Sequence, residues 1–403
     1  MKRPLEGIKV VEAAFWAFVP AAGGILSDMG ASVLKIEPPD GDPIRGLTTG
    51  GSKVEFGFAL SWDNYNRGKR TLTLDLRQEA GVEVLYKLVK EADVFLTNLL
   101  PRARRKMKID IDDLKAINPN LIYAIGSGSG RRGPHADKGG YDSITYWHRS
   151  GISSSMMQEE DRYPPGMPSG AFGDTASAAM LAGGVAAALL QRERTGHAAI
   201  VDASLLNTAM WSMQRAITQA TITGVDKLPR AGREAMSNVL VNNYRTSDGR
   251  LISLCMLQGQ RYWAPLCELM DRPDLATDPR FATDEARERN KAACIAEFDA
   301  IFAAKPVAEW REILARQEGQ WDVVQNVGEM QHDPQVKANN YMQAVDYGDG
   351  RILQMVSSPM QFDGEALPAG PAPQFGAHND EVLAELGYDE DAIIQLKLAN
   401  VVY

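Results

Sequence analysis

Strand-like and helix-like segments alternate from the N-terminus onward in this chain, and few folds accept such an order. Residues 8–12 have the pattern of a strand, residues 21–29 that of a helix, and residues 32–37 that of a second strand. The alternation continues through segments at 71–76, 78–91, 94–96 and 121–125. Because strands joined by a crossover helix run parallel, the sequence predicts an α/β fold with a Rossmann-like parallel sheet.

The pattern changes after a long helix predicted for residues 205–221. Residues 225–330 combine a short β element with charged amphipathic helices, which is typical of a smaller α+β domain. A Pro- and Gly-rich segment at 367–373 then precedes a terminal helix pair that we expect to fold back on the first domain. We therefore predict a large domain over residues 1–222, a small domain over 223–330, and a C-terminal segment, 331–403, that returns to the large domain.

Composition narrows the class of protein. A chain of 403 residues with 44% hydrophobic residues is long enough for two or three domains. Its net charge of −9 argues against broad nucleic-acid binding. The N-terminus does not resemble a signal peptide and we find no apolar stretch of 18 residues, so we expect a cytoplasmic protein without a membrane span. The cysteines and histidines show no metal-ligand spacing, so we expect no metal; the cysteines are Cys255, Cys267 and Cys294.

A candidate for the chemistry is Asp174, which lies between a glycine turn and a long apolar helix. Gly170 and Gly173 permit positive φ angles and leave space beside the carboxylate. We expect Asp174 at the N-cap or in the first turn of the helix, where free N–H groups and the helix dipole keep it ionised. An accessible carboxylate on a buried helix is a candidate nucleophile. The alternative is that Asp174 only caps its helix.

Two basic clusters suggest a ligand rich in phosphate. One spans residues 66–70, and the other contains Arg102, Arg104, Arg105, Lys106 and Lys108. Such runs are usually solvated surface, but both follow or precede predicted strands, where α/β proteins bind ligands.

The Gly/Ser-rich segment 126–130 is followed by Arg-Arg-Gly-Pro rather than a helix start, which disfavours a dinucleotide fingerprint. Aromatic residues at 15–18 and 141–151 are either core or the walls of an apolar acyl pocket.

Ordered matches along nearly the whole chain show that it resembles the class III CoA transferases, also called the CaiB/BaiF or formyl-CoA transferase family. The matching segments are residues 5–12, 28–38, 66–70, 92–98, 173–174, 375–378 and 381–387. The resemblance implies a Rossmann-like large domain built from both termini, a small central domain, and a homodimer in which each ring-like chain is threaded by the other. It also implies coenzyme A or acyl-CoA as co-substrate, with a carboxylic acid as acceptor.

The resemblance implies roles for individual residues. Asp174 corresponds to the family's nucleophile. The expected CoA contacts are Phe15, Trp16, Ala17, Lys69, Arg70, Asn98, Leu99, Arg102, Lys106 and Tyr141. The expected substrate pocket contains Phe18, Trp147 and Met156.

The acyl specificity is expected to differ from that of the formyl-CoA branch. That branch has His-Val-Gln-Ala where this chain has residues 15–18, and it has a polyglycine lid that we do not find here, which argues against formyl or oxalyl transfer. Segments 146–151, 256–263 and 387–390 are most similar to the branch that acts on 2-hydroxy acids such as 2-hydroxyisocaproate or phenyllactate. Aromatic and methionine side chains suit a medium or aromatic acyl chain, since each buried CH₂ contributes about 0.8 kcal/mol.

The resulting hypothesis is CoA transfer through an aspartyl mixed anhydride and an aspartyl-CoA thioester on Asp174. One alternative is an acyl-CoA racemase on the same fold. Related racemases place a histidine where this chain has Tyr141, and a tyrosine with an ordinary pKa near 10 is a poor base at neutral pH. The other alternative is a CoA-binding protein without catalysis.

Overall fold

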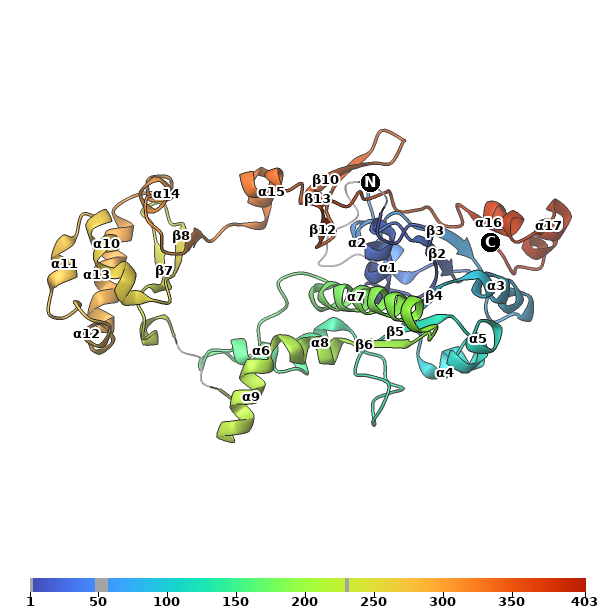
Figure 1. Ribbon diagram of the computed structural model, residues 1–403, viewed down its shortest axis with the longest axis horizontal. Coiled ribbons are helices and arrows are strands. Elements are labelled where there is room, and N and C mark those ends of the chain that lie inside the picture. Colours follow the sequence, from blue (N-terminus) through green and yellow to red (C-terminus); the bar gives the residue numbers. More distant parts are fainter. Residues whose placement is uncertain (1–2, 48–56, 229–231) are drawn as a thin grey trace. The chain divides into compact units, whose positions relative to one another are not determined.

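The computed structural model describes residues 3–47, 57–228 and 232–403, which form two compact units (Figure 1). The first unit contains residues 1–228 and 334–403, and the second contains residues 229–333. The observed division therefore falls at 228/229 and 333/334, whereas the sequence analysis placed it at 222/223 and 330/331.

A six-stranded parallel sheet forms the centre of the first unit, as predicted. Its strand order is β3-β2-β1-β4-β5-β6. The order reverses direction between β1 and β4, as in doubly wound nucleotide-binding sheets. The strands are β1 (Lys9–Ala13), β2 (Ser32–Glu37), β3 (Arg70–Thr73), β4 (Val94–Thr97), β5 (Ile122–Ser127) and β6 (Ile200–Ser204).

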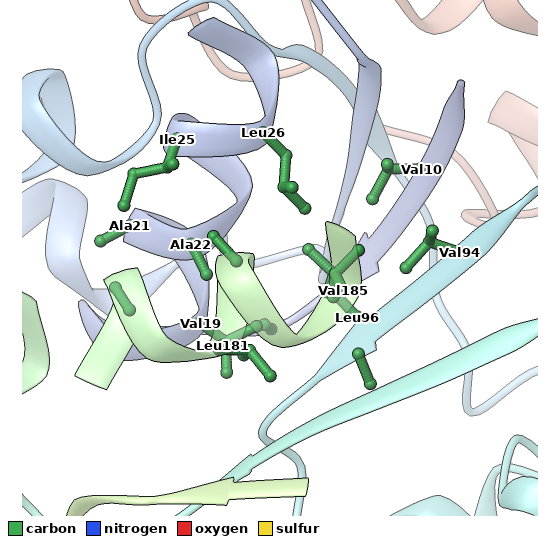
Figure 2. Packing of buried hydrophobic residues seen from close by; sticks show 14 of the residues in the cluster. Val10, Val19, Ala21, Ala22, Ile25, Leu26, Val94, Leu96, Leu181 and Val185 are labelled. Atoms are coloured by element: carbon green, nitrogen blue, oxygen red, sulfur yellow. The ribbon is translucent and has the colours of Figure 1, made fainter. Parts of the chain in front are cut away.

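Helices cover both faces of this sheet because successive strand residues point to opposite faces. Val10 packs with α1 (Phe18–Asp28) and α7 (Phe172–Thr195). Figure 2 shows Leu181 of α7 beside Val19 of α1, and Val185 of α7 beside Leu96 of the sheet. Val11 packs on the other face, against α3 (Glu79–Glu91), α5 (Ile111–Ile117), α16 (Asn379–Glu385) and α17 (Glu390–Leu398).

The long helix α7 is apolar because it is a core helix of this unit. By length and composition it is also the one helix of the described chain that could cross a membrane, a test that core helices of soluble proteins pass too. Its small residues permit close packing: a Cβ added at Gly184 would come within 2.9 Å of Val201 Cγ1 on β6. Its packing on α1 and the sheet accounts for the apolar residues of its buried face.

The C-terminal segment packs on the edge strand β3. The Thr73 N–H donates to Asn379 Oδ1 at 2.9 Å, and the Thr73 hydroxyl donates to the Tyr403 carbonyl at 2.8 Å. Residues from both ends of the chain therefore belong to the first unit.

The remaining elements of the first unit connect these layers or extend from them. The helix predicted for 205–221 is two helices, which meet at Met213. The elements are η1 (Pro43–Gly46), α2 (Leu60–Tyr65), α4 (Pro101–Lys106), the π-helix η2 (Asp142–His148), α6 (Ile152–Met156), α8 (Leu205–Ser212), α9 (Gln214–Thr223), α15 (Pro334–Ala338), β10 (Met342–Asp346), β11 (Ile352–Val356), β12 (Gln361–Phe362) and β13 (Glu365–Ala366).

The second unit is a small α+β body with its own aromatic core. Tyr244 and Trp263 each stack against a phenylalanine, Phe302 and Phe298 respectively. Its antiparallel sheet contains β7 (Val241–Arg245), β8 (Leu251–Cys255) and β9 (Trp321–Val323). Its helices are η3 (Arg233–Ala235), α10 (Gly259–Leu269), α11 (Pro273–Thr277), α12 (Asp284–Arg289), α13 (Lys291–Ala303), α14 (Val307–Leu314) and η4 (Val327–His332).

Candidate active site

A cleft of about 740 Å³ opens at the carboxyl ends of β1, β4 and β5. Three loops that follow these strands line it, together with the first turn of α7. This is the position at which the strand order reverses, where adjacent loops leave the sheet in opposite directions and make a crevice. The cleft brings together eight of the residues singled out in the sequence: Phe15, Trp16, Phe18, Asn98, Leu99, Arg102, Tyr141 and Asp174.

The turn before Asp174 differs from the one expected. Asp174 is the third residue of α7, in its first turn. The positive φ of 58° belongs to Ala171, whereas neither Gly170 nor Gly173 has a positive φ. Gly173 is needed for another reason, because a Cβ there would overlap the Cβ and Cγ atoms of Tyr146. Packing against η2, rather than glycine φ freedom, therefore places Asp174.

The Asp174 carboxylate is half-buried in the cleft and accepts no hydrogen bond from the described residues. Burial and then the nearby Asp142 raise its pKa to about 7. This corrects the expectation that the helix N-terminus keeps Asp174 fully ionised: desolvation outweighs the helix dipole. Because Asp174 accepts no hydrogen bond from the described residues, the alternative that it only caps its helix has no hydrogen bond to support it.

Asp142, which the sequence analysis did not single out, lies beside Asp174. It is the first residue of η2 and is buried, and its Oδ1 accepts the Ser143 N–H at 2.7 Å. The backbone N–H groups of Gly173 and Asp174 act to lower its pKa, but burial has the larger effect and raises it. The sequence signal that could have found Asp142 was an Asp-Ser pair at the start of a helical segment. Such an N-cap pattern predicts where a helix begins, but it does not predict that Asp142 lies beside Asp174.

The loop after β1 is held by side chains from the segments that follow β4 and β2. The Phe15 N–H donates to Asn98 Oδ1 at 3.0 Å, and Asn98 Nδ2 donates to the Phe15 carbonyl at 2.6 Å. The Trp16 N–H donates to Asp42 Oδ1 at 3.1 Å, and Trp16 has a φ of 68°, which is rare for a bulky residue. Its ring meets that of Tyr141 edge to face, with centroids 5.7 Å apart. The cleft wall therefore has a defined backbone and an aromatic surface.

Exposed cationic side chains lie along the same cleft. Arg102 and Arg105 on α4 are exposed and line it, as do Arg131 and Lys138 from the loop after β5. Arg104 also contributes to the lining, but its guanidinium is paired with Asp110 at 3.0 Å. Such a group of cations suits an anionic, phosphate-bearing ligand.

Lys69 and Arg70 were expected at the nucleotide end of the ligand, but the structure does not bring them to the cleft. Lys69 Nζ is buried and donates to Glu12, the Pro20 carbonyl and Asn66 at 2.7–3.0 Å. Burial is the largest effect on its pKa, which is lowered to about 8. Arg70 forms ion pairs with two glutamates of α16, Glu381 and Glu385.

Four further expected site residues also lie outside the cleft lining. Ala17 is buried in a small cluster with Trp62, and Lys106 is exposed at the end of α4. Trp147 is buried, and its Nε1 donates to the Pro165 carbonyl at 2.8 Å. Met156 ends the short helix α6. Within the described ranges, no group of three or more His, Cys, Asp or Glu side chains is placed to hold a metal ion.

Comparison with known proteins identifies the family. Residues 5–379 match the model of CoA-transferase family III. The chain is 32% identical to (R)-2-hydroxy-4-methylpentanoate CoA-transferase of Clostridioides difficile, with 99% of both chains covered. It is 29% identical to cinnamoyl-CoA:phenyllactate CoA-transferase of Clostridium sporogenes, covering 97% of this chain and 95% of the relative.

A solved structure agrees with these relatives. The crystal structure of a CaiB/BaiF family protein from Brucella suis matches with a TM-score of 0.82 at 30% identity, covering 96% of this chain and all of that one. The chain therefore belongs to CoA-transferase family III and is a CoA-transferase that acts on CoA thioesters and carboxylic acids.

Proposed function

We propose that this enzyme moves CoA from an acyl-CoA donor to a free carboxylic acid with Asp174 as the covalent nucleophile. The observation that carries the proposal is a carboxylate that faces the cleft and accepts no hydrogen bond from the described part of the chain. A nucleophile must reach its substrate with a free oxygen, and a carboxylate committed to capping its own helix would not offer one.

The reaction divides into four acyl transfers. An Asp174 oxygen attacks the donor thioester carbonyl, the C–S bond breaks, and CoA thiolate leaves a mixed anhydride. The thiolate attacks the aspartyl carbonyl of that anhydride, which releases the donor acid and forms an aspartyl-CoA thioester. The acceptor carboxylate attacks this thioester to make a second anhydride, and the thiolate then attacks its acceptor carbonyl, which frees Asp174. The thioester energy is conserved only if water is excluded from these intermediates.

The cleft supplies groups for both ends of an acyl-CoA. Arg102, Arg105, Arg131 and Lys138 would bind its phosphates, since guanidinium and ammonium groups form strong charge-assisted hydrogen bonds with phosphate. Phe15, Trp16, Phe18 and Tyr141 would surround the acyl group. We propose a medium-size or aromatic acyl chain, with 2-hydroxy acids as the favoured class, because the named activities of the two relatives concern such acids.

The proposed form of the enzyme is a homodimer. Large apolar side chains are exposed along α7, α8 and α9, and Trp211 is 67% exposed. Every residue of α9 that the structure describes is at least partly exposed. An apolar surface of this kind is typical of a face covered by another chain.

Trapping the covalent intermediate tests the mechanism. The protein is mixed with acyl-CoAs of different chain types and quenched with hydroxylamine, which converts an aspartyl anhydride or thioester into a hydroxamate. Mass spectrometry should find the modification on Asp174, and Asp174→Asn should have neither the modification nor measurable CoA exchange. Asp63→Asn, another buried aspartate in the same unit, should be labelled like the wild type.

An Asp174→Asn variant that still exchanges CoA would contradict the mechanism. Solvent deuterium entering the α-carbon of a chiral acyl-CoA, without CoA exchange, would favour the racemase instead.

A further inference from the structure

We propose that Asp42 is a positioning residue for acyl recognition: its carboxylate holds the Trp16 backbone in a left-handed conformation and so places the Trp16 ring on the cleft wall that meets the acyl group. The inference rests on the proposed function, which assigns the aromatic part of the cleft to the acyl group. It goes beyond that assignment because Asp42 is 2% exposed and does not itself line the cleft.

The first observation is that Trp16 has a backbone conformation that its residue type disfavours. Its φ is 68°, in the left-handed region, whereas the next residue, Ala17, has a φ of −107°. A bulky residue rarely enters the left-handed region, and it stays there only when the surrounding groups hold it. The Trp16 N–H donates to Asp42 Oδ1 at 3.1 Å, which supplies such a hold.

The second observation is that the Asp42 carboxylate is itself fixed. Its Oδ1 also accepts the Ile44 N–H at 3.1 Å, which begins the short helix η1. Its Oδ2 forms an ion pair with Lys35 Nζ at 2.9 Å, and both side chains are fully buried. The Asp42 N–H donates to Glu37 Oε2 at 3.1 Å. Both oxygens and the backbone of Asp42 are therefore engaged, so the acceptor that Trp16 meets has a defined position.

The third observation is that neighbouring residues of the same loop are held in the same way. Lys35 Nζ donates to the Ala14 carbonyl at 2.7 Å. Asn98 binds both the N–H and the carbonyl of Phe15. Side chains therefore bind the backbone of three successive residues, 14, 15 and 16, and Asp42 is the side chain that binds the third.

A carboxylate suits position 42 because donors face it from two sides. The Trp16 and Ile44 N–H groups meet one oxygen, and the Lys35 ammonium group meets the other. An asparagine has one acceptor oxygen and one NH₂ donor, so it can satisfy only one side. The charged Lys35 donor forms the stronger hydrogen bond with that oxygen, which turns the NH₂ group toward the Trp16 N–H. Asp42→Asn therefore removes the hold on Trp16 with little change in size.

Trp16 is the residue through which this hold reaches the cleft. Its side chain packs on one side against a buried cluster that includes Ile44 and Trp62. Its ring also lines the cleft and meets the Tyr141 ring edge to face. The backbone angles set the direction of the Cα–Cβ bond, so a return of Trp16 to a negative φ would redirect the ring. We expect the ring, when held, to favour aromatic acyl groups, which gain edge-to-face or stacking contacts.

The test measures binding rather than turnover, so it does not depend on the nucleophile. In the Asp174→Asn protein, titration calorimetry gives the Kd of acetyl-CoA and of phenylpropionyl-CoA. These two thioesters share the nucleotide and the pantetheine, so the ratio of the two Kd values reports the contact with the larger acyl group. The ratio is compared among the parent, Asp42→Asn, Trp16→Ala and the combination of both, with far-UV circular dichroism as a check on folding.

Asp28→Asn is the matched control. Asp28 is a buried aspartate of the same unit and forms an ion pair with a buried cation, Arg67, at 2.7 Å. Its other hydrogen-bond partner is the Ser358 hydroxyl, at 2.6 Å, and neither partner belongs to the loop after β1. The control therefore reproduces the loss of a buried ion pair without a change at Trp16.

Asp42→Asn should reduce the preference for phenylpropionyl-CoA by about three- to tenfold and leave the Kd of acetyl-CoA unchanged, as expected for the loss of one aromatic contact. Trp16→Ala should reduce the preference at least as much. The combined variant should equal Trp16→Ala alone, because Asp42 acts through the Trp16 ring. Asp28→Asn should keep the preference of the parent.

A folded Asp42→Asn variant with the preference of the parent would overturn the inference. Equal weakening of both thioesters would also overturn it, as would effects of Asp42→Asn and Trp16→Ala that add in full. If the parent binds phenylpropionyl-CoA no more tightly than acetyl-CoA, the acyl wall of the proposed function fails together with the inference. Failure to label Asp174 in the wild type would instead remove the nucleophile and leave the role of Asp42 intact.

A second measurement leaves Asp42 unchanged. If position 16 is held in the left-handed region, glycine is less strained there than alanine, so Trp16→Gly should have a higher thermal midpoint than Trp16→Ala. Ala17→Gly is the control at a negative φ and should lower the midpoint. A lower midpoint for Trp16→Gly than for Trp16→Ala would overturn the inference.

Discussion

At the scale of single residues, the cleft contains a carboxylate, Asp174, whose ionised form costs folding stability. Burial raises the pKa of Asp174 from 3.8 to about 7. Between these two pH values the folded chain binds a proton that the unfolded chain has released, so folding stability decreases as pH rises through this window. The cost is absent below about pH 3.8 and complete above about pH 7.

Asp174→Asn should therefore be more stable than wild type in alkaline solution. The increase in the free energy of unfolding has an upper bound of about 4 kcal/mol at pH 8, from the size of the pKa shift. Denaturation midpoints measured from pH 4 to pH 8 should separate as pH rises and coincide near pH 4. Asp75→Asn is the opposite control, because hydrogen bonding to Arg77 lowers the pKa of Asp75 and its loss should destabilise the protein at pH 8. Equal midpoints for wild type and Asp174→Asn at every pH would refute the burial of this charge.

A second prediction at this scale is that removal of a buried cation lowers stability, whereas removal of a cation that lines the cleft weakens acyl-CoA binding. Lys69→Met leaves Glu12 with one buried cation, Lys35, in place of two, and should lower the free energy of unfolding by about 3–5 kcal/mol. Arg102→Ala should leave stability unchanged and raise the KM for acyl-CoA roughly tenfold, through loss of a charge-assisted phosphate contact. Chemical denaturation of both variants measures the free energy of unfolding, and steady-state kinetics measure the KM for acyl-CoA. A stable Lys69→Met enzyme with a tenfold higher KM would restore Lys69 to the binding site.

At the scale of elements, the contact between η2 and α7 positions the first turn of α7, which carries Asp174. Gly173→Ala would force a methyl group into Tyr146 and should cost about 1–3 kcal/mol, with a loss of CoA exchange because the first turn of α7 must move. Gly170→Ala is the matched control, since a Cβ there has at least 4 Å of clearance from the described part of the chain. Thermal midpoints and exchange rates should change for Gly173→Ala alone. Equal effects at the two glycines would contradict this account.

The elements also show what the sequence could and could not predict. Apolar runs such as residues 94–96 predicted the parallel strands, because strands buried on both faces are largely apolar, and the observed strand is Val94–Thr97. The π-helical form of η2, the break at Met213 between α8 and α9, and the positive φ at Ala171 were not predicted. For η2 the structure shows a contact that a local pattern does not contain, since Tyr146 packs on Gly173 of α7.

The same limit applies to charged residues. The basic run at 66–70 looked like a ligand site, but whether Lys69 points into the protein or into solvent depends on Glu12, which is 57 residues away. Asp174 could be singled out because glycine-aspartate before an apolar helix is a local pattern, although its position in the structure also depends on the packing of Gly173 against Tyr146.

At the scale of the whole molecule, the proposed interlocked homodimer has a topological consequence. Two threaded chains cannot separate without unfolding. Light scattering should therefore give twice the 44.1 kDa of one chain, and dilution to nanomolar concentration should leave that mass unchanged. A mass that falls toward one chain on dilution would indicate an ordinary dimer, and one chain at every concentration would exclude dimerisation.

The loop after β1 explains how one scaffold could come to serve different acids. Its backbone is fixed by Asn98 and Asp42, which belong to other segments, and not by its own aromatic side chains. Mutation at positions 15 and 16 can therefore alter the shape of the cleft wall while the main chain keeps its course. Natural drift or laboratory selection could exchange substrates there without rebuilding the catalytic centre.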